Sequence, residues 1–203
     1  MMRSGNITDL EVTMAEIKPI ETFYKGYRFR SRLEARWAVF FDATGIKYQY
    51  EPEGYDLGDG VYYLPDFYLP EMKQFFEVKA DINAIPTNDM EKIIRLANQT
   101  GKNVIVGDGF FNLAGNEPDE GQRTEKEKYD FWGCDTYLVR CRECKTLYFE
   151  NEMSYRCTAC GYYDGDSTFD YVSDRYWDEY PEYIKAINAA KQARFEYGET
   201  PTI

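Results

Sequence analysis

The chain has 203 residues, enough for one domain with an appended module, and its formal net charge of −12 argues against a uniformly basic DNA-coating protein. It contains no histidine, which excludes Ser-His-Asp triads, Cys-His nucleophiles and metal sites built on histidine. No run approaches the roughly 18 apolar residues of a membrane span, and the N-terminus lacks the apolar stretch of a secretory signal, so we expect a cytoplasmic protein.

Residues 1–19 are expected to form a flexible leader. The charge is locally reversed after them, because residues 24–36 (YKGYRFRSRLEAR) carry five cations against a single acid. These cations are Lys25, Arg28, Arg30, Arg32 and Arg36. Arginines four residues apart share a helix face, which can grip backbone phosphates beside a catalytic pocket. The strip is therefore predicted to bind nucleic acid, although a solvated approach to a helix would explain the same charges.

The first predicted helix covers residues 32–44. Ser31 precedes it and Glu34 follows three residues later, which is the pattern of a capping box. Large apolar residues recur at helical spacing up to Gly45, a good helix terminator. Glu34 has two open interpretations: it completes the cap, or it is a third acid that contacts a metal or its water.

Three strands, a second helix and a further strand are predicted next. The strands cover 46–57, 60–69 and 73–80, each rich in aromatic or β-branched residues. The helix covers 86–101, and a short apolar run at 102–110 is typical of a buried strand. This order predicts an α/β core over residues 20–110, with a mixed central sheet flanked by helices.

Four regularly spaced cysteines follow a polar linker predicted at residues 111–133. Within residues 134–163, the spacing is Cys-x2-Cys, twelve residues, Cys-x2-Cys, which is typical of a structural zinc ribbon. The four predicted Zn²⁺ ligands are Cys141, Cys144, Cys157 and Cys160. Disulfides would need an oxidising compartment, and an iron–sulfur cluster is the main rival. A closed site of four thiolates holds a module together and does not catalyse.

The last segment, residues 164–203, is predicted to be an acidic, aromatic stretch followed by a C-terminal helix. Seven acids and one arginine lie between positions 162 and 183, which favours a solvated loop. Pro181 begins an amphipathic pattern that predicts the final helix.

Two acids and a lysine lie in the predicted strands. Alternate residues of a strand share a face, so Glu77 and Lys79 are expected to point the same way. Pro65 marks a strand end or bulge that would aim Asp66 toward the neighbouring strand. If the two strands pair, the carboxylates of Asp66 and Glu77 converge, and such oxygens suit Mg²⁺ or Mn²⁺. Solvated charges on a sheet edge are the alternative interpretation.

These segments resemble a known family. LPDF and FFEVKA, preceded by RSRLEARWAVFFDATG, are similar to the PD-(D/E)XK nuclease superfamily, above all its small phage and mobile-element members. The resemblance covers about residues 24–108 and implies a restriction-endonuclease-like fold with metal-dependent hydrolysis of DNA. It implies catalytic roles for Asp66 as the motif aspartate, for Glu77 and Lys79 as the acid and lysine, and for Glu34 on the first helix.

We therefore expect a nuclease that hydrolyses DNA phosphodiester bonds with a metal-activated water, using Mg²⁺ or Mn²⁺ at Asp66 and Glu77. Lys79 would stabilise the charge that develops on the phosphate. Two alternatives stay open: a non-catalytic DNA- or protein-binding module on the same fold, and a subunit active only within a recombination, transposition or phage complex. A protein partner or a homodimer is compatible with each, and no membrane partner is expected.

Overall fold

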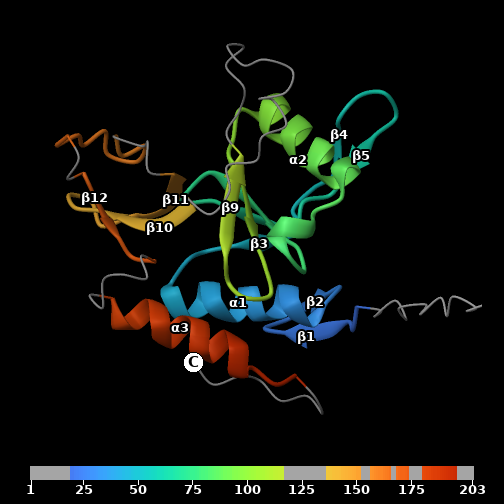
Figure 1. Ribbon diagram of the computed structural model, residues 1–203, viewed down its shortest axis with the longest axis horizontal. Helices are drawn as coiled ribbons and strands as arrows, with labels where there is room; N and C mark the ends of the chain where they lie inside the picture. Colours follow the sequence, from blue (N-terminus) through green and yellow to red (C-terminus); the bar gives the residue numbers. More distant parts are fainter. Residues whose placement is uncertain (1–18, 117–135, 152–155, 166–167, 174–179, 196–203) are drawn as a thin grey trace, which may run out of the picture.

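The structure is a computed structural model that describes residues 19–116, 136–151, 156–165, 168–173 and 180–195 (Figure 1). Its helices are α1 (Arg32–Thr44), α2 (Thr87–Thr100) and α3 (Pro181–Gln192). Its strands are β1 (Thr22–Tyr24), β2 (Tyr27–Phe29), β3 (Gln49–Tyr50), β4 (Tyr55–Asp56), β5 (Tyr62–Tyr63), β6 (Phe67–Leu69), β7 (Gln74–Val78), β8 (Val104–Gly107), β9 (Leu113–Asn116), β10 (Thr136–Cys141), β11 (Leu147–Asn151) and β12 (Phe169–Tyr171). The predicted leader lies outside these residues, apart from its last position.

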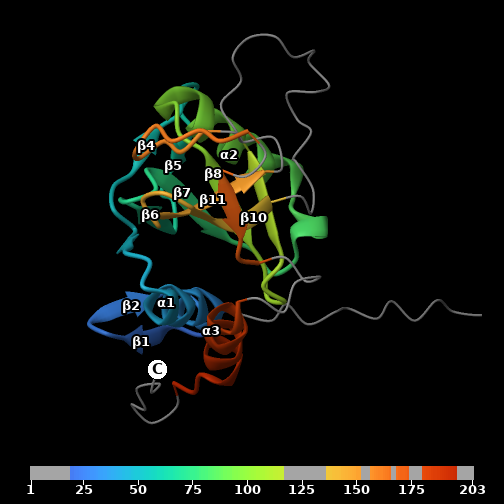
Figure 2. The same ribbon diagram turned by 90° about the vertical axis from the view of Figure 1, so that its left-hand side faces the viewer.

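A five-stranded mixed sheet forms the centre of the molecule. Its order is β3-β6-β7-β8-β9, with β7 and β8 parallel and the other pairs antiparallel. The crossover from β7 to β8 contains α2, and Figures 1 and 2 show α1 and α2 on opposite sides of the sheet. The predicted α/β architecture with a mixed sheet is thus confirmed.

Side-chain alternation along β7 fills both faces of this sheet. Phe76 packs into the core cluster that contains α1, and Phe75 packs into the cluster that contains α2. Both rings are at most 1% exposed. The predicted period-two pattern is therefore present, but neither face of β7 is open to solvent along its length.

The bounds predicted for α1 are confirmed at both ends. The Glu34 amide donates to Ser31 Oγ over 3.1 Å, so Ser31 is the N-cap. Gly45 ends the helix with a φ of 75°, a conformation that favours glycine. The large side chains of the helix, Trp37 among them, are buried against the sheet.

Two of the predicted strands are wrong as continuous elements. The segment 46–57 forms β3 and β4, which belong to different sheets, and the chain turns between them at Glu51, whose φ is 45°. The segment 60–69 forms β5 and β6, interrupted at Pro65 and Asp66. Proline has no amide to donate to a neighbouring strand, and this explains the interruption.

Several strands lie where none was predicted: β1, β2 and β10, and also β9 and β12. Residues 113–116 begin the predicted linker but form β9, an edge strand on β8, with Leu113 and Ala114 buried. The rest of that linker, residues 117–133, lies outside the described residues. In the acidic segment, β12 pairs with β10, and its Asp170 forms an ion pair with Arg142 at 2.6 Å. Acidic residues there are thus part of the three-stranded sheet β11-β10-β12.

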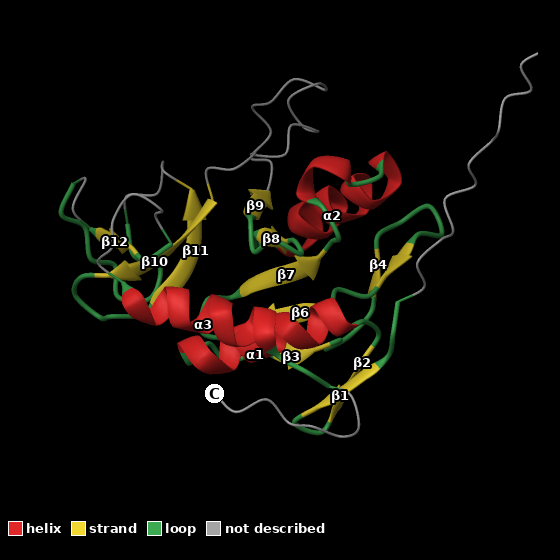
Figure 3. Cartoon of the chain, turned by 60° about the horizontal axis from the view of Figure 1, so that its bottom comes forward, coloured by secondary structure: helices red, strands yellow, loops and turns green. Residues whose placement is uncertain are grey.

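The cysteine-bearing sheet is fixed to the central sheet through a buried glutamine. The Gln74 side-chain amide donates to the Phe149 carbonyl over 2.6 Å and accepts from the Phe149 amide over 3.2 Å. Phe149 also contacts Phe76, with ring centroids 5.4 Å apart. Figure 3 shows α3 running beside α1, where Tyr183 meets Phe40 edge to face. In the described part of the chain, no helix has the length and apolar character needed to cross a membrane.

Candidate functional site

Asp66 and Glu77 meet where β6 begins beside β7. The Asp66 amide donates to Glu77 Oε1 over 3.1 Å, and the Val78 amide donates to Asp66 Oδ2 over 2.8 Å. Each carboxylate therefore holds the backbone of the opposite segment. Asp66 is 6% exposed and Glu77 is 2% exposed. The structure brings these two acids together, as the sequence predicts, because the chain leaves the ladder at Pro65.

Glu34 joins this pair from the start of α1. Its Oε1 accepts from Ser31 Oγ over 2.8 Å, and its Oε2 accepts from the Arg30 amide over 3.0 Å and the Tyr50 hydroxyl over 2.6 Å. Both interpretations of Glu34 thus have a basis. It completes the helix cap, and its negative charge lies close enough to Asp66 to raise the pKa of that carboxyl.

Nearby cations compensate the charge of the two acids only in part. Burial, followed by the negative charge of Glu34, raises the pKa of Asp66 to about 6, against the pull of the Val78 amide and the cations Arg30 and Lys79. Burial and the charge of Asp66 raise the pKa of Glu77 well above its ordinary range. A bound cation would relieve both effects, since it favours the ionised form of each carboxyl.

Arg30 is the cation in direct contact with the acids. Its Nη2 lies 2.6 Å from Asp66 Oδ1, and its Nε lies 2.7 Å from Glu51 Oε1. From sequence, Arg30 is one of five predicted nucleic-acid contacts, whereas the structure places it inside the acid cluster. Its side chain is about half exposed, so it spans from the cluster to the surface.

Lys79 lies beside the acids, but its direct partner is another residue. Its Nζ contacts Asp89 Oδ2 at 3.0 Å, and its charge lowers the pKa of both Asp66 and Glu77 from nearby. Asp89, in the first turn of α2, is a residue that sequence reasoning missed. The signal that could have found it is an acid in the first turn of the helix that follows Lys79.

Tyr63 is a second residue that sequence reasoning missed. Its hydroxyl is buried without a hydrogen-bond partner among the described residues, and burial and the charge of Glu77 raise its pKa. The hydroxyl therefore borders the cluster. Nothing in the sequence separates Tyr63 from the many other tyrosines of the chain.

Two of the cluster's carboxylates lie side by side, and most of their oxygens already accept a hydrogen bond. Among the described residues, Glu77 Oε1 accepts from the Asp66 amide, and each oxygen of Asp66 accepts one hydrogen bond. The three acids do not bring their oxygens within 4.8 Å of one another. A metal ion at this site would therefore be held by the carboxylates of Asp66 and Glu77 rather than by all three acids.

The predicted basic strip does not form one surface. Lys25 pairs with Asp42 at 3.1 Å and Arg28 pairs with Glu21, both away from the acid cluster. The remaining two, Arg32 and Arg36, line a separate groove with residues of the C-terminal segment.

The four cysteines converge on one point from two matching turns. Cys141 Sγ and Cys160 Sγ are 3.8 Å apart, and Cys144 Sγ and Cys157 Sγ are 3.6 Å apart. Tetrahedral zinc with bonds of about 2.3 Å requires sulfur separations of about 3.8 Å. In each turn, the residue after the second cysteine donates its amide to the carbonyl of the first, with a φ of 63° or 73°. Among the described residues, these four side chains form a cluster that can hold a metal ion, and their geometry fits zinc.

Comparisons of the chain with protein-family models, with curated proteins and with solved structures find no match.

Proposed function

We propose that the protein is a metal-dependent nuclease of the PD-(D/E)XK type that hydrolyses phosphodiester bonds in DNA. The observation that supports it best is the buried Asp66–Glu77 pair, in which each carboxylate accepts a hydrogen bond from the backbone of the opposite segment. Side-by-side buried acids with raised pKa values weaken a fold, and such perturbed groups concentrate at sites of chemistry. Lys79 adds the cation that this reaction type uses.

The residues divide the work according to their contacts. Asp66 and Glu77 would hold Mg²⁺ or Mn²⁺, and the bound ion would supply Lewis-acid polarisation of the phosphate and a more acidic water. Lys79 keeps a positive charge beside both acids, where it can meet a phosphate oxygen that displaces Asp89. Glu34 acts as a positioning residue, because it binds the Arg30 amide and the Tyr50 hydroxyl.

For the four-cysteine cluster we propose structural Zn²⁺. Four thiolates leave no open position, so the ion would hold the two turns together and take no part in catalysis. The contact between Gln74 and Phe149 then transmits this rigidity to β7, the strand that carries Glu77.

The direct test is cleavage of plasmid and linear DNA in Mg²⁺ or Mn²⁺. Wild type is expected to cut. Asp66→Ala and Lys79→Ala are each expected to lower the cleavage rate at least about 100-fold, the loss typical when a group that stabilises charge in the transition state is removed. Asp59→Asn removes an exposed acid outside the cluster and serves as the matched control. Cutting by Asp66→Ala at the wild-type rate, or intact DNA with wild type on every substrate and metal, would refute the assignment.

A nuclease that works only within a larger complex is the second candidate. In the chain by itself, Arg30 contacts Asp66 and Lys79 contacts Asp89. Both nearby cations are therefore engaged by acids, and a partner that rearranges these ion pairs would be needed to free them for a phosphate. Electron paramagnetic resonance with Mn²⁺ separates the candidates. Binding of Mn²⁺ that depends on Asp66 and Glu77, without cleavage of any DNA, would favour the complex-dependent enzyme.

A further inference from the structure

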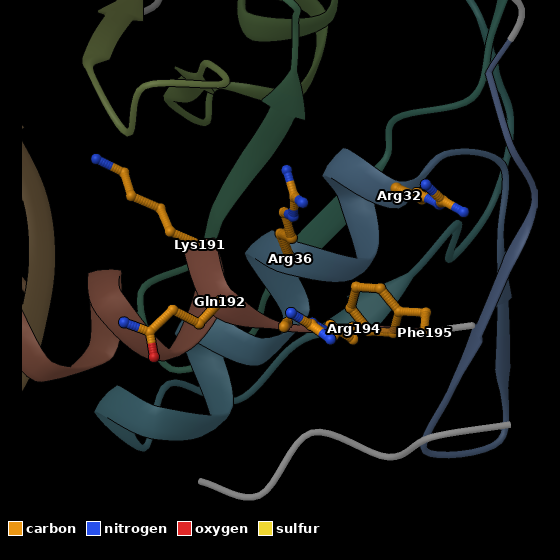
Figure 4. Close-up of a pocket in the computed structure, with 7 residues that line it drawn as sticks. Arg32, Arg36, Lys191, Gln192, Arg194 and Phe195 are labelled. Carbon is orange, nitrogen blue, oxygen red and sulfur yellow. The ribbon is translucent and has the colours of Figure 1, made fainter. Parts of the chain in front are cut away.

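A groove of about 600 Å³ lies between α1 and the C-terminal end of α3 together with the residues that follow it. Seven residues line it: Arg32, Arg36, Lys191, Gln192, Ala193, Arg194 and Phe195. Figure 4 shows that the basic side chains come from both sides, Arg32 and Arg36 from α1, and Lys191 and Arg194 from the last turn of α3 and the residues after it. Segments about 150 residues apart in sequence thus build one surface.

The seven residues that line the groove are predominantly basic. They include four cations, one amide and one aromatic ring, and none of the seven residues is acidic. This contrasts with the chain as a whole, whose net charge is −12. A concave surface of one charge sign concentrates ions of the opposite sign, so the groove selects an anionic ligand.

Arg36 provides the most specific sign of a missing partner. Among the described residues, its buried Nε has no hydrogen-bond partner and its side chain forms no ion pair. Burying a guanidinium nitrogen without a partner is costly, because the group loses water and gains nothing in return. Arg36 also lines the groove, and guanidinium groups bind phosphate oxygens well, so an oxygen-rich anion there would give this side chain a partner.

The walls of the groove are held by packing. Lys191 lies over the ring of Phe111, with its Nζ 5.7 Å from the ring centroid, and Phe195 meets Tyr24 edge to face at 6.0 Å. Ala193 is buried where the chain leaves α3. The groove therefore rests on the same core that positions the acid cluster.

The groove and the acid cluster are linked through neighbouring residues of the chain. Arg30 contacts Asp66, and Arg32 lines the groove only two residues later, a separation that spans at most about 7 Å of backbone. A phosphate-bearing chain held along the groove can therefore continue to Arg30 and the acids. The volume exceeds what a single phosphate ion fills, and this favours a polymeric anion.

We propose that this groove binds the sugar-phosphate backbone of the DNA strand whose scissile phosphate is presented to Asp66 and Glu77. Arg36, Lys191 and Arg194 contact the phosphates, and Phe195 offers a ring on which a base can stack. The inference deepens the proposed nuclease function and rests on it. It assigns the C-terminal segment to substrate binding.

The test measures DNA binding in the absence of cleavage. Fluorescence anisotropy follows a labelled single strand of about 16 nucleotides, the upper end of the site size of one small domain, with full-length Asp66→Asn protein. Lys191→Gln with Arg194→Gln should weaken binding and reduce the slope of log affinity against log salt by about 1.4, or about 0.7 per charge. Lys185→Gln, an exposed lysine on α3 outside the groove, should leave the slope unchanged.

Lys191 and Arg194 are exposed, so the double variant is not expected to disturb the core. Arg36→Gln tests the groove independently, and circular dichroism checks that this variant folds. An unchanged slope in the double variant, or a strand that does not bind at low salt, would overturn the groove proposal. Failure of the nuclease proposal has a different signature, since wild type would then leave DNA intact while the groove variants still reduced binding.

Discussion

Replacing Asp66 with asparagine is predicted to stabilise the protein in magnesium-free buffer while abolishing cleavage. The pKa of the Asp66 carboxyl rises from 3.8 to about 6 in the folded protein, chiefly through burial and then the charge of Glu34. A shift of about 2 units corresponds to about 3 kcal/mol of unfolding free energy. Asparagine removes this penalty but weakens the contact with the half-exposed Arg30, which costs about 1 kcal/mol. The net gain expected at pH 8 is about 2 kcal/mol.

The pH dependence identifies the cause. Because the folded-state pKa is raised, the wild-type carboxyl is protonated in both states below about pH 4, and no penalty applies there. Stability is lost as the pH rises through the folded pKa of about 6. The advantage of Asp66→Asn should therefore grow by about 1.5 kcal/mol between pH 5 and pH 8.

Urea unfolding of wild type and Asp66→Asn at a series of pH values, with zinc retained and magnesium removed, measures this difference in stability. It is obtained from the shift in the urea midpoint, provided that the dependence of the unfolding free energy on urea is the same for both proteins. Asp59→Asn, an exposed acid paired with Arg95, should show no such trend. An Asp66→Asn protein less stable than wild type at pH 8, with a difference independent of pH, would show that the buried carboxyl is already compensated. The electrostatic argument for a cation at Asp66 would then lose its support.

Three further predictions concern the scaffold. The purified protein should contain about one zinc per chain by elemental analysis, and Cys144→Ser should lose the metal and lower the melting temperature; a metal-free protein of equal stability would contradict the zinc site. Gln74→Leu should cost about 2 kcal/mol in chemical unfolding, because it leaves the buried amide and carbonyl of Phe149 unpaired; a neutral effect would show that these groups find other partners. Gly107→Ala should cost about 1 to 3 kcal/mol or more, since a Cβ there would lie 2.4 Å from the Trp37 ring; a stable, unshifted variant would contradict the tight packing at β8.

The sequence by itself determined the features encoded within short stretches. Ser31 and Gly45 set the ends of α1, because a side-chain cap and a left-handed terminator act over one turn of helix. The Cys-x2-Cys spacing determined the paired turns of the four-cysteine cluster. Pro65 determined where the ladder between β6 and β7 begins, and with it the approach of Asp66 to Glu77.

Only the tertiary structure decided which charges meet. Arg30 and Arg32 look alike in the basic strip, yet the first contacts Asp66 and the second lines the groove. Arg30 lies in the bend before α1, whereas Arg32 is the first residue of the helix. Lys79 pairs with Asp89 because the crossover brings α2 against the end of β7.

Lys191 and Arg194 line one groove with Arg36 because α3 packs along α1 through Tyr183 and its small buried residues. Such partners are chosen by packing between segments far apart in the chain. No local propensity or spacing reports that choice, and this is why the acid cluster was predictable in its residues and the groove was not.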